Sequence, residues 1–258
     1  MGKPYPLLLL SMLILGLSSC APLMPPPPPP PTETPLGPTV TPTATTVWFP
    51  PTPTNTPMPT ATLSLTPTID TRPQFGNLLF QDDFSTSVSW SSGRVSDGRI
   101  SPGQNELSLV VTRDKGYLYS IRPGVALSDF YLEINASPSI CRDGDEYGLL
   151  LRVSPDMDFY RFSLSCRGEA RVDRFLNNAA SSPQPPILSG AVPPGAPSIS
   201  RLAVWAVGKE MRFYANGEYL FTVIDPTIPM GYIGVFVRAA TEDMVSVSFS
   251  DLKVYKPR

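Results

Sequence analysis

The sequence predicts an all-β protein: one antiparallel sandwich of two sheets, preceded by a disordered linker rich in proline and threonine. Two observations predict this fold class. After residue 74, apolar and polar residues alternate with a period of two in about a dozen segments, and no segment has a convincing period of 3.6. Before that point, the composition is different, because 18 of the 33 prolines lie between residues 21 and 73. We therefore divide the chain into residues 1–19, 20–74 and 75–258.

Residues 1–19 have the features of an export signal. Lys3 is followed by an apolar stretch, Leu7–Leu17, that is too short to span a bilayer comfortably. The segment ends in Leu17-Ser18-Ser19-Cys20, which resembles the bacterial lipobox. This resemblance implies cleavage before Cys20 and a diacylglycerol thioether on its sulfur, which would hold the protein at a membrane. We expect a lipid-anchored, extracytoplasmic protein at the cell membrane or cell surface; the alternative is an ordinary secretory signal with an incidental cysteine.

Residues 20–74 are predicted to be a spacer, starting at the lipidated cysteine. Between residues 21 and 73 there are 15 threonines and only three charged residues, and Pro25–Pro31 is an unbroken run of proline. Proline lacks a backbone N–H and favours extended polyproline II, so such a segment has no apolar face to bury. We expect a stiff stalk, and a docking ligand for a proline-binding module is the alternative.

The period-two segments define the expected strands of residues 75–258. Leu202–Val207 and Tyr232–Val237 are apolar on both faces, so we expect them to lie in the interior of their sheets. Asn216-Gly217 joins two such segments and favours a type I′ hairpin. The alternation changes parity near Asp251, which predicts a β-bulge. Asn177–Pro197, rich in proline and poor in charge, is expected to be a long loop.

Cys141 and Cys166 remain as a pair once Cys20 is assigned to the lipid. In an exported domain, such a pair is most simply a disulfide. Cys141 precedes the predicted strand Tyr147–Val153, and Cys166 ends the predicted strand Tyr160–Cys166. The bridge would therefore close the open end of a hairpin.

Several segments, taken in order, resemble the concanavalin A-like jelly rolls of the laminin-G type. They are Asp82-Asp83-Phe84 followed by Trp90, Asp129–Ile134, Leu202–Trp205 with Met211–Gly217, and Tyr232–Val235. The resemblance covers nearly all of residues 78–255. It implies a two-sheet jelly-roll sandwich, often a glycan binder and sometimes a glycoside hydrolase.

The composition excludes several classes of function. The chain contains no histidine, which excludes Ser-His-Asp and Cys-His catalysis and imidazole metal ligands. A net charge of −2 gives no electrostatic basis for nucleic-acid binding. Retaining glycosidases need two carboxylates about 5 Å apart, and the nearest segment to the motif of similar hydrolases, Glu133-Ile134-Asn135, lacks the second acid. We therefore expect that the protein is not an enzyme. The alternative is a glycoside hydrolase-like activity, similar to that of 3-keto-disaccharide hydrolases.

Four charged residues are candidate ligand contacts. Arg152 and Arg161 lie on the two arms of the predicted disulfide hairpin, and Arg171 and Asp173 share one face of the next strand. Such side chains can fix sugar hydroxyls by hydrogen bonds. The alternative is a solvated charged face with mutual ion pairs. The aromatic residues expected in the core rather than on a binding platform are Tyr147, Tyr160 and Trp205.

A structural calcium ion is the one cofactor that the sequence suggests. Asp82 or Asp83, near the first strand, and Asp251, at the predicted bulge, could meet where the terminal strands of a jelly roll pair, and carboxylate oxygens suit Ca²⁺. Asp143–Glu146 is a second acidic cluster, for which we expect a solvated turn, with a calcium-binding loop as the alternative.

The function expected from the sequence is that of a surface-anchored bacterial lipoprotein whose sandwich binds a glycan or another component of the cell envelope without catalysis. Its partners would be the membrane, through the lipid, and a polysaccharide or cell-wall glycan. A protein-interaction or structural module of the envelope is the alternative.

Overall fold

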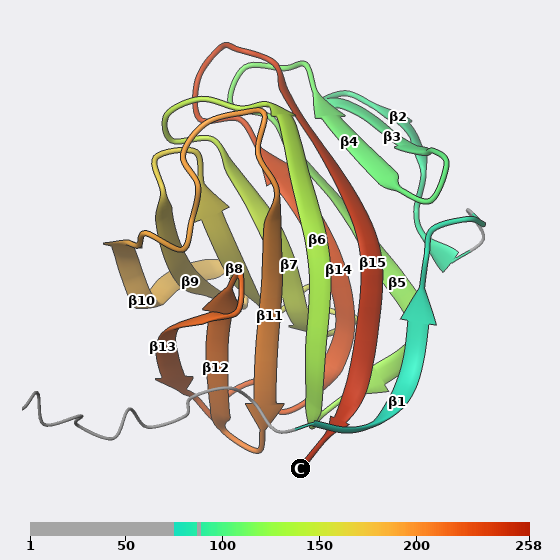
Figure 1. Ribbon diagram of the computed structural model, residues 1–258, viewed down its shortest axis with the longest axis vertical. Helices are drawn as coiled ribbons and strands as arrows, with labels where there is room; N and C mark the ends of the chain where they lie inside the picture. The colour runs from blue at the N-terminus through green and yellow to red at the C-terminus, as the bar shows by residue number, and fades with distance from the viewer. Residues whose placement is uncertain (1–74, 87–88) are drawn as a thin grey trace, which may run out of the picture. The chain divides into compact units, whose positions relative to one another are not determined.

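The computed structural model describes residues 75–86 and 89–258, so the expected signal segment, Cys20 and the stalk lie outside the described residues. This described part contains strands and no α-helix, and therefore no helix that could cross a membrane (Figure 1). The strands are β1 (Phe75–Asp82), β2 (Gly93–Val95), β3 (Gly98–Pro102), β4 (Leu107–Val111), β5 (Tyr117–Leu127), β6 (Phe130–Ile140), β7 (Glu146–Val153), β8 (Phe159–Ser165), β9 (Glu169–Leu176), β10 (Ala179–Leu188), β11 (Ser200–Val207), β12 (Glu210–Ala215), β13 (Glu218–Ile224), β14 (Gly231–Arg238) and β15 (Val245–Pro257).

The strands form two antiparallel sheets that pack against each other (Figure 1). Sheet A has nine strands in the order β13-β12-β11-β6-β15-β4-β3-β2, with β1 paired to β15. Sheet B has six strands in the order β10-β9-β8-β7-β14-β5. The predicted all-β sandwich is confirmed. The first and last strands, β1 and β15, are direct neighbours, so both ends of the folded region lie in sheet A.

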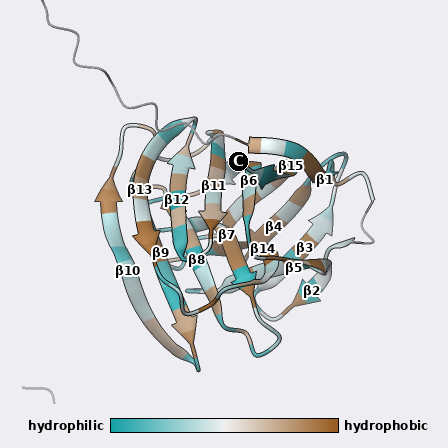
Figure 2. Cartoon of the chain, turned by 90° about the horizontal axis from the view of Figure 1, so that it is seen from below, coloured by the Kyte–Doolittle hydropathy of each residue, from teal (hydrophilic) through white to brown (hydrophobic). Residues whose placement is uncertain are grey.

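The core lies between the sheets because a strand projects successive side chains to opposite sides. Phe130, Leu132 and Ile134 of β6 are buried in the common core, as are Phe162 and Leu164 of β8. Hydrophilic and hydrophobic segments alternate along the strands accordingly (Figure 2). Full burial of each such side chain contributes about 1.5–3 kcal/mol, so this shared layer joins the two sheets.

Three local predictions are confirmed by the backbone. Asn216 and Gly217 have φ values of 52° and 83° between β12 and β13, the positive values that a type I′ turn requires. Asp251 has a φ of 53° where the register between β15 and β6 shifts. The strands expected in sheet interiors are interior: β11 lies between β12 and β6, and β14 lies between β7 and β5.

The segment Asn177–Pro197 corrects one prediction, because it is not a loop throughout. Ala179–Leu188 forms β10, an edge strand paired to β9 with two shifts in register. Proline is tolerated in such a strand because an edge needs backbone hydrogen bonds on one side only, and a bulge removes some of those. A proline-rich composition alone therefore did not reveal this strand.

The three aromatic residues expected in the core separate into two groups. Tyr147 and Tyr160 are buried between the sheets, as predicted. Trp205 is instead half-buried on the outer face of sheet A, where the guanidinium carbon of Arg212 lies 4.5 Å from its ring centre. The strand that carries Trp205 is apolar on both faces, so hydrophobicity did not identify which face is the core.

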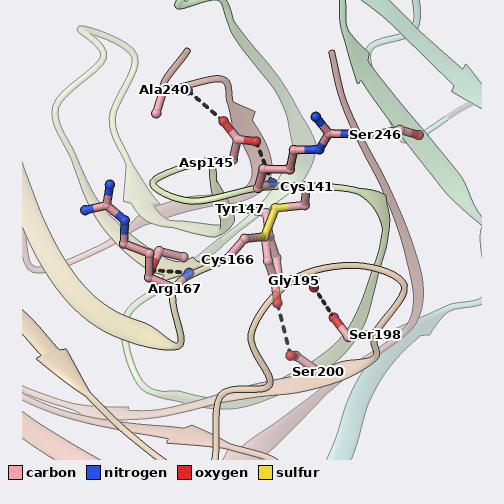
Figure 3. The surroundings of a disulfide bond; sticks show 12 residues. Cys141, Asp145, Tyr147, Cys166, Arg167, Gly195, Ser198, Ser200, Ala240 and Ser246 are labelled. Atoms are coloured by element: carbon pink, nitrogen blue, oxygen red, sulfur yellow. Dashed lines mark hydrogen bonds between the residues drawn. A yellow bond between two sulfur atoms is a disulfide. The ribbon is translucent and has the colours of Figure 1, made fainter. Parts of the chain in front are cut away.

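Cys141 and Cys166 form the predicted disulfide, with Cα atoms 6.0 Å apart (Figure 3). The bridge lies at the end of the β7–β8 hairpin opposite to its turn, which spans residues 154–158. It therefore ties the chain before β7 to the chain after β8, at the open end of the hairpin.

The acidic cluster Asp143–Glu146 is only partly the solvated turn that we expected. Asp145 and Glu146 are buried. The Asp145 carboxylate accepts hydrogen bonds from the backbone N–H groups of Arg142, at 2.8 Å, and Ala240, at 2.9 Å (Figure 3). These bonds hold the loop beside the disulfide and place Glu146 as the first residue of β7.

Removal of the disulfide should destabilise the domain. The variant Cys141→Ala/Cys166→Ala releases a cross-link between residues 25 apart in sequence, which should lower the free energy of unfolding by about 3 kcal/mol. For a domain of this size we expect Tm to fall by roughly 6–12 °C, measured by calorimetry on the full chain. Reduction of the unaltered protein should give a similar fall, and an unchanged Tm in both experiments would contradict the prediction.

Candidate functional site

The candidate site is the outer face of sheet B, which is the face turned away from sheet A. Its side chains are alternate residues of five neighbouring strands, and the antiparallel register arranges them in rows across the sheet. The rows, each read from β5 to β9, are Tyr119, Phe236, Gly148, Ser163 and Arg171; then Ile121, Gly234, Leu150, Arg161 and Asp173; then Tyr117, Arg238, Glu146, Ser165 and Glu169.

The centre of this face is buried although its side chains point away from the main core. Leu150 and Phe236 are fully buried and belong to a separate small apolar cluster. Ser163, on the adjacent strand, is only 1% exposed. Gly148 allows the strands to approach closely here, because a Cβ atom at that position would overlap the carbonyl oxygen of Phe162. The longer side chains around this floor therefore cover it.

Arg161 stands above the floor and is 8% exposed. Its Nη2 donates to Asp173 Oδ2 at 2.8 Å and lies 3.8 Å from Glu146 Oε2. Its guanidinium carbon lies 4.9 Å from the ring centre of Phe175 and 5.4 Å from that of Phe236, within the range of cation–π attraction. A buried charge is unfavourable unless it is paired, and here two carboxylates and two rings compensate it.

Each of the two carboxylates binds more than one arginine. Glu146 Oε2 lies 3.1 Å from Arg238 Nη1, and Glu146 Oε1 lies 3.6 Å from Arg171 Nη1. Asp173 Oδ1 accepts hydrogen bonds from Arg171 Nη2 and from Ser182 Oγ. The side chains of Glu146 and Asp173 are 7% and 2% exposed, so the acids lie beneath the arginines.

The contacts of Asp173 and Arg171 shift the pKa of each group toward its charged form. Burial alone would raise the pKa of Asp173, but hydrogen bonds from Arg171 and its other donors outweigh burial and hold this pKa below 3.8. Burial opposes the charge of Arg171, but Asp173 and two nearby glutamates raise its pKa above the usual range. At neutral pH both groups are charged, so Asp173 is an ion-pair partner and not a proton donor.

Aromatic rings border a cavity of about 250 Å³ beside the arginines. Phe159 and Phe175 stack with ring centres 4.7 Å apart, and Tyr117 stacks on Phe236 at 5.6 Å. Aromatic faces beside hydrogen-bond donors form the kind of wall that can contact both the C–H groups and the hydroxyls of a sugar. The cavity is lined by Tyr117, Phe159, Arg161, Phe175 and Arg238.

Tyr117 also borders a second cavity, of about 370 Å³. This cavity lies between β5 and the segment that contains β2, and Tyr119, which is 40% exposed, contributes to its wall. The ring centres of Tyr117 and Tyr119 are 5.8 Å apart. Tyr117 is the residue that lines both cavities, and Tyr119 lines the second alone.

Three of the four predicted ligand contacts meet at this site: Arg161, Arg171 and Asp173. The ion pairs that we considered as the alternative are present, and the role of these three residues as ligand contacts stays a prediction. The fourth residue, Arg152, does not join them. Its backbone has a φ of 52°, which breaks the alternation that would have placed it on the face of Arg161.

Arg152 instead bonds to backbone carbonyl groups at the end of β7. It is fully buried and donates to the carbonyl oxygens of Ser128 and Gly208, both at 2.8 Å, and of Ile228, at 3.1 Å. Burial lowers the pKa of its guanidinium. These three carbonyls belong to three different loops, so Arg152 connects loops, and we leave it out of the candidate site.

Sequence reasoning missed Glu146, Arg238 and the bordering aromatic residues. Glu146 was grouped with an acidic loop, but it lies two residues before Gly148 on β7 and therefore projects to the same face of sheet B. Arg238 lies two residues after Phe236 on β14 and projects to this face as well. The period-two signal that placed Arg171 and Asp173 together could have found both, once the strand boundaries were extended by one residue.

The three aspartates considered as calcium ligands do not form such a site in residues 75–86 and 89–258, where no group of three acidic or cysteine side chains could hold a metal ion. Asp82 accepts a hydrogen bond from the indole N–H of Trp90 at 3.0 Å and pairs with Arg122 at 3.2 Å. Asp83 and Asp251 each bind other side-chain or backbone donors. A calcium ion stays a prediction that these contacts do not require.

The outer face of sheet A carries another aromatic cluster, but the first residue of β1 covers it. Phe75 stacks on Tyr131, with ring centres 4.8 Å apart and planes 11° apart, and lies 4.7 Å from the ring centre of Tyr255. These rings pack on one another rather than around a cavity, so we prefer sheet B as the functional face.

No family model matches the chain, and no curated protein matches it. Solved structures do match. A protein of unknown function with a galectin-like fold from Bacillus subtilis is 15% identical, with a TM-score of 0.56; the match covers 71% of this chain and 98% of that one. A native glycosidic hydrolase is 11% identical, with a TM-score of 0.54 and coverage of 68% and 94%. The catalytic domain of an endo-1,3-beta-glucanase (laminarinase) from Thermotoga petrophila is 9% identical, with a TM-score of 0.52 and coverage of 72% and 99%.

At these identities the likeness establishes the fold. The neighbours are galectin-like and glycosidase sandwiches, which agrees with the concanavalin A-like jelly roll expected from the sequence. The matches cover nearly the whole of each neighbour, so this chain contains a complete sandwich of this type.

Replacement of Arg152 should destabilise the fold more than replacement of an exposed arginine. Arg152→Ala leaves three carbonyls without their donor and should cost about 3 kcal/mol or more. Arg212→Ala is the control, because Arg212 is 40% exposed and pairs with Glu210 on the surface, and should cost less than about 1 kcal/mol. Denaturant unfolding of both variants tests this, and an equal loss in the two would show that Arg152 has no special structural role.

Proposed function

We propose that the outer face of sheet B binds a glycan and that the protein is a binding module rather than an enzyme. The observation that carries the proposal is the aromatic-bordered cavity beside the Arg161 network. Sugars present C–H patches to aromatic rings and hydroxyls to charged hydrogen-bond donors, and both kinds of group line this cavity. The ion pairs hold the arginines in place before a ligand arrives, which reduces the entropy lost on binding.

Two further observations support a glycan as the ligand. The glycosidic hydrolase and the laminarinase among the structural neighbours are named for action on glycans, and they share this fold. The second hollow beside Tyr117 extends the surface along β5, which offers a chain of sugars more contact than one residue would need.

The state of the two carboxylates favours binding over hydrolysis. Glycoside hydrolysis requires one carboxyl group that stays protonated, with a raised pKa, and a second that is free to attack or to activate water. Glu146 and Asp173 both contact Arg161 Nη2 and are bonded to further arginines. The pKa of Asp173 is lowered, which is the opposite of what an acid catalyst needs.

We also propose that a lipid on Cys20 anchors the protein at the membrane and that the stalk carries the sandwich away from it. When the full chain is expressed in a bacterium, it should be recovered in the membrane fraction with the added mass of a lipid. Cys20→Ala should move the protein to the soluble fraction, because the proposed attachment atom is removed. Membrane recovery of both forms would argue against anchoring through Cys20.

An exposed tyrosine on the binding face should matter for glycan affinity. Tyr119→Ala removes a ring that is 40% exposed on sheet B and should weaken binding about tenfold, since an aromatic contact contributes about 1–1.5 kcal/mol. Tyr219→Ala is the matched control, because Tyr219 is 41% exposed but lies on β13 of sheet A. Affinity for the best ligand of a glycan array, measured by calorimetry, provides the comparison.

Equal weakening in the two variants would place the ligand elsewhere. Absence of binding to every polysaccharide in the array would reject the glycan proposal and favour a protein-interaction or structural module. Release of reducing sugars from the same polysaccharides would reject the non-catalytic part of the proposal.

A further inference from the structure

We infer that the glycan bound at the outer face of sheet B is acidic and that its sugars carry carboxylate groups, as in a polyuronate. This inference rests on the proposed function, because it names the class of glycan for the same site. It is carried by the sign and the accessibility of the charges around the cavity between β5, β8 and β9.

The cavity wall contains positive groups and no negative ones. Arg161 and Arg238 are its charged residues, and its other lining residues are aromatic. The acids of the network lie below this wall, since the Glu146 and Asp173 side chains are 7% and 2% exposed. The Arg238 side chain, by contrast, is 40% exposed, and that of Arg171 is 27% exposed. A ligand that enters the cavity therefore meets guanidinium groups first.

The arginines at the wall retain hydrogen-bonding capacity. The ion pairs of Arg161 use Nη2, and the ion pair of Arg238 uses Nη1. A guanidinium carries N–H donors on all three nitrogens and accepts no hydrogen bond. The remaining N–H groups of these arginines can therefore donate hydrogen bonds to oxygen atoms of a ligand. Ser163 Oγ, on the floor, is buried and makes no hydrogen bond within the described part of the chain, but Ser163 does not line the cavity, so the arginines are the donors that a ligand there would meet.

The charges of the network are separated in space rather than in excess. Arg161, Arg171 and Arg238 face three acids, Glu146, Asp173 and Glu169, and Glu169 lies close enough to Arg171 to help raise its pKa. Of these six groups, Arg161 and Arg238 line the cavity and the three acids do not. The positive character of the cavity therefore comes from the placement of these two arginines and not from the net charge of the face.

A carboxylate suits this arrangement better than a neutral hydroxyl. Its two oxygens can accept two parallel N–H bonds from one guanidinium, and such charge-assisted bonds are roughly twice as strong as neutral ones. The ring faces of Tyr117, Phe159 and Phe175 can at the same time contact the C–H groups of the sugar that carries the carboxylate.

The test compares each acidic polysaccharide with its own neutral form. Polygalacturonate, alginate and hyaluronate are offered to the full chain beside the same polymers after reduction of their carboxyl groups, with dextran and dextran sulfate as a pair that differs in sulfate. We expect at least one carboxylated polymer to bind tenfold or more tightly than its reduced form. This preference should shrink as salt rises from low to high concentration.

Substitutions of single arginines show which side chain causes the preference for carboxylated polymers. Arg238→Gln should weaken binding of the carboxylated polymer about fivefold to tenfold and leave binding of the reduced form unchanged, whereas Arg238→Lys should retain much of the preference. Arg212→Gln is the matched control, because the Arg212 side chain is also 40% exposed but lies on sheet A and pairs with Glu210. We expect no change in that variant, and thermal unfolding confirms that all three remain folded.

The outcomes separate this inference from the proposed function. Equal binding of carboxylated and reduced polymers, or binding of neutral polymers only, overturns the acidic ligand and leaves glycan binding intact. Binding of dextran sulfate as tight as that of every polyuronate, with no effect of Arg238→Gln, shows unspecific charge attraction and also overturns it. Absence of binding to all polymers, neutral and acidic, overturns the proposed function, and this inference with it.

Discussion

The fold buries the charged side chain of Arg161 on the outer face of sheet B. The groups that compensate this charge make up the surface around it. Removal of a guanidinium from water costs several kcal/mol unless carboxylates and hydrogen bonds replace the water. The neighbouring strands on either side supply them, Glu146 from β7 and Asp173 from β9, and Phe175 and Phe236 cover the planar group. The same contacts constrain the side chains of Glu146 and Asp173 in the absence of a ligand.

The disulfide and the ionic network are parts of one structural arrangement. Cys141 lies five residues before Glu146, and Asp145 ties the intervening loop to the backbone beside Ala240. The covalent bridge and these hydrogen bonds fix where β7 begins, and Glu146 is its first residue. A small shift at this end of the hairpin would therefore move the carboxylate that three arginines share.

Much of this fold could be predicted from the sequence because period-two alternation is a local property that survives folding. It placed Arg161, Arg171 and Asp173 on one face, and the Asn216-Gly217 turn followed from backbone preference alone. What failed depended on contacts that are distant in sequence. The positive φ of Arg152 turns it toward three loops, and the three prolines of β10 are acceptable because that strand lies at an edge. The aromatic border of the cavity combines residues of β5, β8 and β9, whose proximity no local pattern reveals.

The position of β1 determines how the domain would respond to a mechanical load. Among the described residues, this strand pairs only with β15, and its first residue, Phe75, lies opposite Pro257 at the very end of that pair. A pull applied to the chain at residue 75 would act on this rung before any other in the described part of the chain, while sheet B, which carries the proposed site, would not be loaded directly. The stacking of Phe75 on Tyr131 and Tyr255 is the first contact that resists such a pull. The resistance of the folded region to such a load would thus depend on one peripheral strand and three rings of sheet A, and not on sheet B.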